Sequence, residues 1–325
     1  MKPNIKKLFQ KTIDIESIFN ESEKDISTSK NESALRESSH LEEFRKQISN
    51  ICIFPLNIRE NCQGNYSKYI RTGLTHISQL HHIKFEYALE DPKIMEGVQD
   101  LPISNKKILL LDLDETLIHA DFDEEYLDDK SNKYDAIIKF KVNRQEKEES
   151  DNNMDIEDST WCSGMEEDED EDNLHSVGIF VRNNAISFLQ KVSKYFDVGI
   201  FTASVKEYAD AVISFFDPEN KLIKFRLYRN NCINFNNSFY VKDLRIFKNV
   251  DLRNIVLLDN SIYSFAAQIN NGILINSFFN NKNDEELNNA FEYLINYILP
   301  SDDVKKVNEE FFNFGQIIND LINCK

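Results

Sequence analysis

Three short apolar runs, each stopped by a polar residue, constrain the fold of this chain more than any other feature. They are residues 108–111 before Asp112, residues 198–201 before Thr202, and residues 255–258 before Asp259. Runs this short that are apolar on both faces are typical of central strands in a parallel sheet. The sequence therefore predicts that one buried parallel sheet contains all three runs.

Segments with helical spacing separate and follow these runs. They are residues 185–195, residues 205–216 and a shorter segment near residues 262–269. Alternation of strand and helix predicts the α/β class, with a doubly wound parallel sheet. In such sheets ligands bind at the carboxyl ends of the strands. We therefore expect Asp112, Thr202 and Asp259 to lie together at one edge of the sheet.

An acidic segment separates residues 134–142 from residues 176–182, and both of these flanks have strand character. Residues 146–172 hold fourteen Asp and Glu side chains and one lysine, Lys147, so they carry −13 of the formal net charge of −18 and leave −5 elsewhere. We interpret residues 144–175 as a disordered insert at a hairpin tip, since the cost of closing a loop grows slowly with its length. Binding of a basic partner and competition with acidic substrates remain open as its roles.

The composition also limits the classes of partner and compartment. An acidic chain lacks the attraction for phosphate backbones that drives general nucleic-acid binding. No apolar run reaches the roughly 18 residues that a membrane span needs, and the first residues lack the apolar core of a signal peptide. The five cysteines are scattered and never form a CxxC pair, which fits reduced thiols. We therefore expect the chain in the nucleus or the cytoplasm; a monomer is the favoured oligomeric state, which the sequence leaves open.

The chain divides into segments that differ in composition and in the spacing of apolar residues. Residues 1–50 are polar and expected to be disordered, residues 51–104 to form a partly helical extension, residues 105–315 to form the α/β domain, and residues 316–325 a helical end. The helix expected in the extension depends on regularly spaced apolar residues, namely Ile70, Leu74, Ile77, Leu80 and Ile83. The sequence does not indicate a function for it.

Asp112 and Asp114 are the residues most indicative of chemistry. Two carboxylates spaced by one residue at a strand end can both reach one site when the chain turns out of the strand. The first could attack phosphorus, and the second could protonate the leaving oxygen and later activate water. Because a phosphoryl group is densely negative, two carboxylates beside it need a divalent cation, for which Mg²⁺ suits oxygen ligands, and a lysine. Downstream the sequence offers Lys242, further oxygen ligands at Asp259 and Asn260, and a hydroxyl at Thr202.

Five motifs together identify a family. They are DLDETLIH, IFTAS with EYAD shortly after it, RLYRNNC, FYVKDL and LLDNS. They strongly resemble the phosphatases of the small C-terminal-domain phosphatase type in the haloacid dehalogenase superfamily, which are also called NLI-interacting-factor-like phosphatases. The resemblance covers roughly residues 105–315, interrupted by the acidic insert. It implies a Rossmann-like parallel sheet with a small β insertion and no large cap.

The resemblance implies roles for individual residues. Within the DxDxT motif, Asp112 matches the nucleophile that forms an aspartyl phosphate, and Asp114 matches the general acid and base. Thr116 and Thr202 are grouped with the phosphate-binding residues, and Lys242 matches the lysine that neutralises the nucleophile and the phosphate.

The resemblance also implies a metal site and a substrate pocket. Mg²⁺ would be held by Asp112, the backbone carbonyl of Asp114 and Asn260, with Asp259 behind them. Arg229 matches an arginine that contacts the substrate phosphate. Aromatic and aliphatic residues match a pocket that receives a proline next to phosphoserine; these are Phe122 and Tyr208, with Phe140 and Val142 near them.

Departures from the family pattern occur at two places. Asn183 follows Arg182 where the family usually has proline, which is expected to loosen the start of a helix without touching the chemistry. One extra residue lies between Cys232 and Tyr240. His119 and the pair at residues 81–82 are interpreted as structural histidines, because no further metal-ligand spacing accompanies them.

The sequence thus predicts a Mg²⁺-dependent phosphatase acting on phosphoserine or phosphothreonine in proteins. By resemblance its substrate would be rich in Ser-Pro, such as the C-terminal repeat of RNA polymerase II. A receiver-type switch is disfavoured because the nucleophile here lies inside DxDxT, and Asp114 supplies an acid that a switch does not need. A catalytically silent scaffold remains the alternative, although none of the motif residues is lost.

Overall fold

A parallel sheet of five strands forms the centre of the computed structural model, in the order β10-β9-β1-β5-β6. The model describes residues 63–80, 91, 94–96, 98, 104–122, 133–141, 174–235 and 239–323. The strands are β1 (Ile108–Leu111), β5 (Asp197–Phe201), β6 (Phe225–Leu227), β9 (Ile255–Asp259) and β10 (Gly272–Leu274). The three apolar runs are therefore the three adjacent central strands, and the predicted α/β parallel sheet is confirmed.

The register of the sheet brings the polar residues at the ends of the strands to one edge. In β1, Leu111 lies opposite Ile200 of β5 and Leu258 of β9. All four residues of β1 are completely buried, because β1 has a strand on each side and helices over both faces. Asp112 is thus level with Asp259 and with Phe201, and Thr202 follows one residue further along at the same edge of the sheet.

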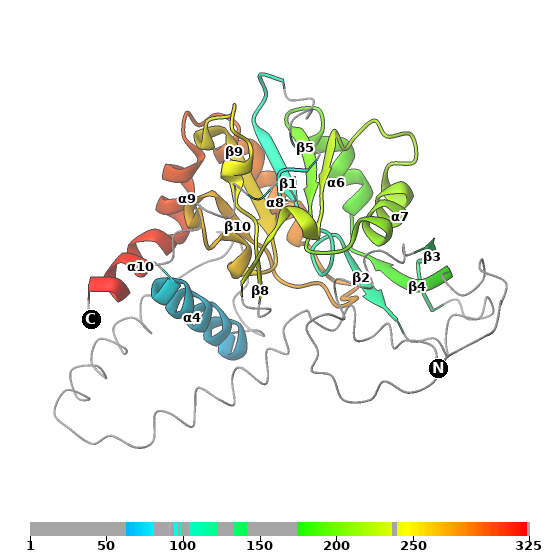
Figure 1. Ribbon diagram of the computed structural model, residues 1–325, viewed down its shortest axis with the longest axis horizontal. Helices are drawn as coiled ribbons and strands as arrows, with labels where there is room; N and C mark the ends of the chain where they lie inside the picture. Colours follow the sequence, from blue (N-terminus) through cyan, green and yellow to red (C-terminus); the bar gives the residue numbers. More distant parts are fainter. Residues whose placement is uncertain are drawn as a thin grey trace, which may run out of the picture.

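Helices flank the sheet. They are α4 (Gln63–Leu80), α6 (Ala185–Val192), α7 (Lys206–Phe216), α8 (Glu286–Tyr293), α9 (Val304–Phe312) and α10 (Phe314–Asn323). In Figure 1, α9 and α10 lie to the left of the sheet, and α6 and α7 lie to its right. The segment expected to be helical near residues 262–269 forms two 3₁₀ turns instead, Ile262–Phe265 and Ile269–Asn271. None of the described helices has the length and apolar character of a membrane span.

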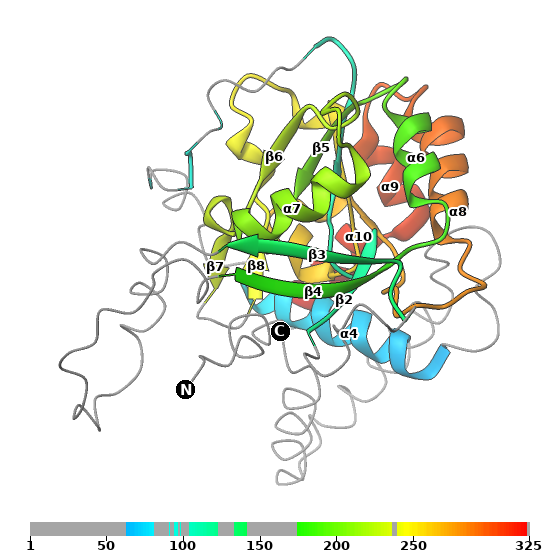
Figure 2. The same ribbon diagram turned by 90° about the vertical axis from the view of Figure 1, so that its right-hand side faces the viewer.

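Two small antiparallel sheets project from this core. The first contains β2 (Ile118–Asp121), β3 (Ala136–Lys141) and β4 (Leu174–Val181) in the order β2-β4-β3, and the second is the pair β7 (Ile233–Phe235) and β8 (Phe239–Val241). Figure 2 shows β3 and β4 running side by side beneath α7.

The two strands expected on either side of the acidic insert are present as β3 and β4. The predicted end of the insert at residue 175 is wrong, because Leu174 pairs with Lys141 and His175 pairs with Phe140. The ring of His175 also packs on that of Phe140, with centroids 5.7 Å apart, so ladder pairing continues into the segment assigned to the insert.

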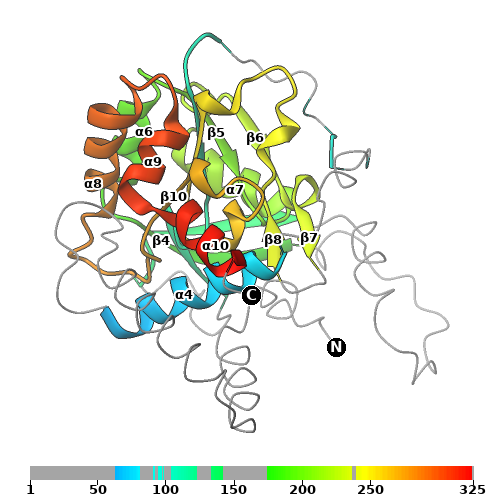
Figure 3. The same ribbon diagram turned by 90° about the vertical axis from the view of Figure 1, so that its left-hand side faces the viewer.

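The helix expected in the N-terminal extension is α4, in which Ile70, Leu74 and Ile77 are buried. It packs against α10 (Figure 3), so the two ends of the described chain lie together. The division proposed between residues 315 and 316 falls inside α10. Residues 1–50 and most of residues 51–104 lie outside the described part of the chain, and their assignment stays a prediction.

Candidate active site

A tight turn after β1 places Asp112 and Asp114 at the edge of the sheet. Asp112 is buried, and its N–H donates to the carbonyl of Leu258 at 3.0 Å. The carbonyl of Leu113 then accepts the N–H groups of Leu117 and Ile118 at 2.9 and 3.2 Å, which closes the turn. Glu115 takes a left-handed φ of 56°, a conformation that glycine adopts without strain. The turn therefore holds a glutamate side chain in a backbone conformation that costs strain.

Lys242 links two buried carboxylates at the centre of the site. Its Nζ lies 2.6 Å from Oδ1 of Asp112 and 2.6 Å from Oδ2 of Asp259. Burial raises the pKa of Asp112 to about 8, while the Lys242 ammonium opposes that rise. Burial alone would lower the pKa of Lys242, but the two carboxylates raise it above its ordinary value, so the lysine stays charged. Two carboxylates thus share one cation in a low-dielectric environment.

Asp114 is held by two hydroxyl groups. The Oγ of Ser204 donates to its Oδ2, and the phenol of Tyr208 donates to its Oδ1, both at 2.5 Å. Burial raises the pKa of Asp114 to about 6 and nearby Glu115 adds to the rise, whereas the two hydroxyl groups act in the opposite direction. A carboxyl group with a pKa near neutrality can both donate and accept a proton at physiological pH.

Thr202 and Arg229 lie on the β5 side of this group. Thr202 follows β5, is buried, and its Oγ1 accepts the N–H of Ser204 at 3.0 Å, so the hydroxyl proton can be donated to a ligand. The Nε of Arg229 donates to the carbonyl of Ala203 at 2.7 Å, and the guanidinium lies over the ring of Tyr240. By contrast, the nearby Arg226 pairs with Asp210 at 2.7 Å. Of these two arginines, Arg229 is the one held beside Thr202.

Asn260 faces the DxDxT turn from the end of β9. Its Nδ2 donates to Ser277 at 3.1 Å, and its Oδ1 lies 3.4 Å from Oγ1 of Thr116. The bond to Ser277 directs the amide oxygen toward the turn. Asp259 is already engaged on both oxygens, by Lys242 and by the N–H of Ser261 at 2.7 Å, so it supports the lysine rather than offering an open ligand.

These residues fit an oxygen-liganded divalent cation. Asp112, Asp114 and Asp259 lie close to one lysine, which leaves an excess of negative charge that a second cation would balance. Carboxylate, carbonyl and amide oxygens are the donors that Mg²⁺ takes. No cluster of three or more His, Cys, Asp or Glu side chains able to hold a metal occurs in the described residues. The Mg²⁺ site expected here does not need such a cluster. Its donors are the Asp112 carboxylate, the Asp114 backbone carbonyl and the Asn260 amide oxygen, so only one of them is a carboxylate side chain.

The aromatic residues predicted to form a substrate pocket do cluster, but Tyr208 has a different position from the one expected. The Tyr208 ring lies 6.0 Å from that of Phe122 and 5.5 Å from that of Phe140. Tyr208 is 0% exposed, so it cannot present an open face to a substrate; its hydroxyl contacts Asp114 instead. Phe122 is the member that keeps partial exposure, and Val142 lies outside the described residues.

His119 has the structural setting that we predicted for it. Its Nδ1 lies 3.2 Å from Glu115, and its ring packs against Phe180 and Phe279. The histidines at residues 81–82 lie outside the described residues.

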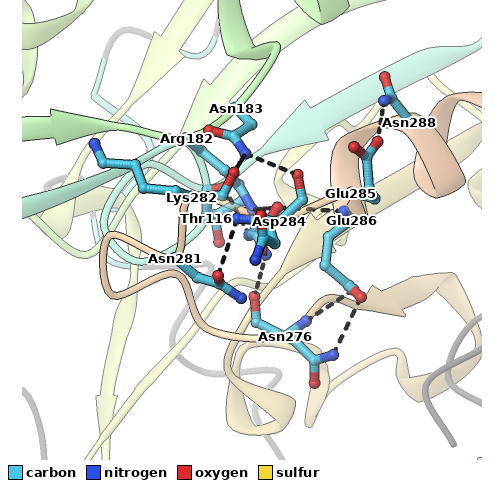
Figure 4. A network of polar contacts seen from close by, with 11 residues as sticks. Thr116, Arg182, Asn183, Asn276, Asn281, Lys282, Asp284, Glu285, Glu286 and Asn288 are labelled. Carbon is cyan, nitrogen blue, oxygen red and sulfur yellow. Dashed lines mark hydrogen bonds and ion pairs between the residues drawn. The ribbon is translucent and has the colours of Figure 1, made fainter.

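A buried network behind the site was not expected. Arg182 donates through Nε and Nη2 to the two oxygens of Asp284, both at 2.8 Å (Figure 4). Its Nη1 and Nη2 also donate to the carbonyls of Thr116 and Asn276, at 3.0 and 2.7 Å. Arg182 therefore connects the DxDxT turn to the segment between β10 and α8, which also carries Ser277.

Asn183, expected to loosen the start of α6, ties that start to the same segment. Its Nδ2 donates to the carbonyls of Lys282 and Asp284, at 2.7 and 3.1 Å (Figure 4). The expectation is wrong because an asparagine side chain supplies two hydrogen bonds that a proline cannot make. Asn184, with a φ of 65°, completes the turn before α6.

Sequence reasoning missed three residues that the structure brings to the site or to the network behind it. Ser204 contacts Asp114, Ser277 contacts Asn260, and Asp284 contacts Arg182. Ser204 had a local signal, because it stands two positions after a strand-end residue, as Asp114 does. Ser277 and Asp284 had none, because their partners lie far away in the chain.

Comparison with known proteins decides the family. The model of the NLI interacting factor-like phosphatases matches residues 107–305, which is more than half of the chain. The chain belongs to this family. It is 41% identical over 132 residues to the CTD small phosphatase-like protein 2 of Dictyostelium discoideum, covering 41% of this chain and 23% of that protein.

Two further relatives extend the comparison. The chain is 30% identical over 190 residues to the human carboxy-terminal domain RNA polymerase II polypeptide A small phosphatase 1, covering 58% of this chain and 59% of that protein. It is 28% identical over 239 residues to the CTD nuclear envelope phosphatase 1B of Danio rerio, covering 72% of this chain and 82% of that protein. Three of the relatives with the strongest matches, among them the Dictyostelium protein above, are covered over only 23%, 39% and 36% of their own lengths, so the chain spans less than two thirds of each.

Proposed function

We propose that this chain is a Mg²⁺-dependent protein serine/threonine phosphatase that works through an aspartyl phosphate. One observation carries the proposal. A nucleophile candidate, Asp112, is held by a buried lysine, and a second carboxyl group two residues later has a pKa near neutrality. Family membership agrees with this assignment.

In the first step Asp112 attacks phosphorus. Lys242 contacts Oδ1, which leaves Oδ2 as the attacking atom. As the new P–O bond forms, the bond from phosphorus to the serine or threonine oxygen breaks, and Asp114 donates its proton to the leaving oxygen. In the second step Asp114 removes a proton from water, which attacks the aspartyl phosphate, releases inorganic phosphate and restores the Asp112 carboxylate.

The other residues stabilise charge on the transferring group. Thr202 donates its hydroxyl proton, and Lys242 and Arg229 supply positive charge to the equatorial oxygens, which is the main task in phosphoryl transfer. Mg²⁺ bound by Asp112, the Asp114 carbonyl and Asn260 would add electrostatic stabilisation of the same oxygens. Ser204 and Tyr208 keep Asp114 oriented between its two tasks.

The test is hydrolysis of para-nitrophenyl phosphate with Mg²⁺ and with excess chelator. Asp112→Asn should remove activity, and Asp114→Asn should let a hydroxylamine-labile phosphoenzyme accumulate, because water is no longer activated. Asp251→Asn is the matched control, since Asp251 is exposed and pairs with Arg253. Unchanged activity in Asp112→Asn would exclude the aspartyl phosphate. A wild-type protein inert toward this ester and toward phosphopeptides would instead support a silent scaffold.

For the substrate, we propose phosphorylated Ser-Pro sites, such as those of the RNA polymerase II C-terminal repeat. Two observations support this substrate. One relative is named as a phosphatase of that domain, and Phe122 lies partly exposed beside the aromatic cluster. Relatives named for the C-terminal domain and the nuclear envelope also support a nuclear or cytoplasmic location. Phe122→Ala should raise KM for a phosphoserine-proline peptide and leave para-nitrophenyl phosphate hydrolysis unchanged. Equal KM values for proline and alanine after phosphoserine would contradict the site preference.

A further inference from the structure

The 3₁₀ turn Ile262–Phe265 follows Asn260 in the chain and contacts the segment that carries Lys242. It begins two residues after Asn260, and all four of its residues are buried. The carbonyl of Ser264 accepts the N–H of Lys242 at 3.1 Å. The ring of Tyr263 stacks on Phe239 of β8, the strand that leads into Lys242, with centroids 4.7 Å apart. A shift of this turn would therefore move both the amide of Asn260 and the lysine.

Helix α4 packs directly on this turn from outside. A Cβ on Gly73 would lie 2.4 Å from Cγ2 of Ile262, so the helix backbone touches the turn at a point where only glycine fits. One helical turn further on, Nδ1 of His76 lies 2.9 Å from the hydroxyl of Tyr263. Helix α4 also packs against α10 (Figures 1 and 3). The helix lies outside residues 107–305, which the family model matches.

We propose that α4 is a positioning element of the active site: it holds the turn Ile262–Phe265, and through that turn the Asn260 amide and the Lys242 ammonium. This inference depends on the proposed Mg²⁺ site. The close approach at Gly73 is what separates it from ordinary packing. Because Ile262 is fully buried and its Cγ2 methyl group is attached to a branched Cβ, this side chain can yield only by leaving its rotamer in a packed environment or by moving its main chain. Asn260 is only two residues before Ile262, so a shift of the main chain at Ile262 would change the bonds that orient the Asn260 amide between Ser277 and Thr116.

The test adds one methyl group and then makes room for it. Gly73→Ala should weaken Mg²⁺ binding to the full-length chain by about tenfold, the scale seen when support behind metal ligands is removed. Binding is measured by isothermal titration calorimetry and by the rise in unfolding temperature that Mg²⁺ causes. Alanine favours helix over glycine, so a loss cannot come from weaker helix formation in α4. Gly73→Ala with Ile262→Leu, which lacks the Cγ2 methyl group, should restore binding.

Val192→Ala is the control, because Val192 is fully buried in the distant helix α6. It should lower the unfolding temperature and leave Mg²⁺ affinity at the wild-type value. If Gly73→Ala does not fold, His76→Ala tests the same contact without added volume and should lower Mg²⁺ affinity in the same direction. Wild-type affinity in folded Gly73→Ala, or in His76→Ala when Gly73→Ala does not fold, overturns the inference. A wild-type protein that neither binds Mg²⁺ nor hydrolyses phosphate esters overturns the proposed function instead.

Discussion

Replacing Arg182 by methionine tests the network behind the active site. The arginine side chain is completely buried, as is nearly all of Asp284, and the two form a bidentate pair. Methionine fills a similar volume but removes the cation, so Asp284 becomes a buried charge without its partner. The carbonyls of Thr116 and Asn276 lose their donors at the same time.

The expected loss is large compared with the stability of a domain. Removing one partner of a buried ion pair costs about 3–5 kcal/mol, whereas the whole free energy of unfolding is typically about 5–15 kcal/mol. The double variant Arg182→Met with Asp284→Leu should recover most of this loss, because it removes the uncompensated charge. It should stay below the wild type by about 1–3 kcal/mol for each of the two buried carbonyls that it leaves without a donor.

The measurement is equilibrium unfolding in urea at neutral pH for the wild type, both single variants and the double variant. Lys206→Met is the control, because Lys206 pairs with Asp210 at 2.7 Å but is mostly exposed, and a surface pair contributes less than about 1 kcal/mol. Two results would refute the reasoning: a loss in Arg182→Met no larger than in this control, or a double variant as unstable as the two single losses added together.

Further predictions concern single groups and the insert. The hydroxyl of Tyr208 stabilises the charged form of Asp114, so Tyr208→Phe should raise the pKa of Asp114 above about 6 and move the corresponding limb of the pH–rate profile to higher pH; an unmoved limb contradicts this. Burial would raise the pKa of Asp217, but the N–H groups of Lys221, Leu222 and Ile223 lower it overall. Its contribution is therefore present above the unfolded pKa of about 4 and lost as pH falls through the lower folded value. Asp217→Asn should destabilise the fold at neutral pH, and the difference should shrink below about pH 4; a constant difference in urea unfolding across that range argues against it. Deletion of residues 146–172 should change turnover of para-nitrophenyl phosphate little, and a collapse in rate would show that the insert is structural.

The elements that could be predicted are those whose signal is local. Three apolar runs define the central strands, and parallel register alone then gathers Asp112, Thr202 and Asp259 at one edge. The roles of Ser277 and Asp284 could not be obtained in this way. Arg182 and Asp284 are 102 residues apart, and a buried pair formed across such a distance leaves no periodic pattern in either segment. The burial of Tyr208 was missed for a related reason, because an aromatic residue in a helix looks the same whether its hydroxyl meets a substrate or a carboxylate.

Strands β3 and β4 fix where the acidic insert is attached to the domain. The insert joins Lys141 of β3 to Leu174 of β4, at one end of the β2-β4-β3 sheet. The other end of β4, at Val181, pairs with Ile118 just after the DxDxT turn. Seven residues of extended strand separate these ends, which is roughly 23 Å. The attachment point therefore lies almost three screening lengths from the DxDxT turn, since that length is about 8 Å at physiological salt. Among the described residues, burial, Lys242 and the neighbouring carboxylates of Asp259 and Glu115 shift the pKa values of Asp112 and Asp114, so the site has its own charge balance apart from the total charge of the chain.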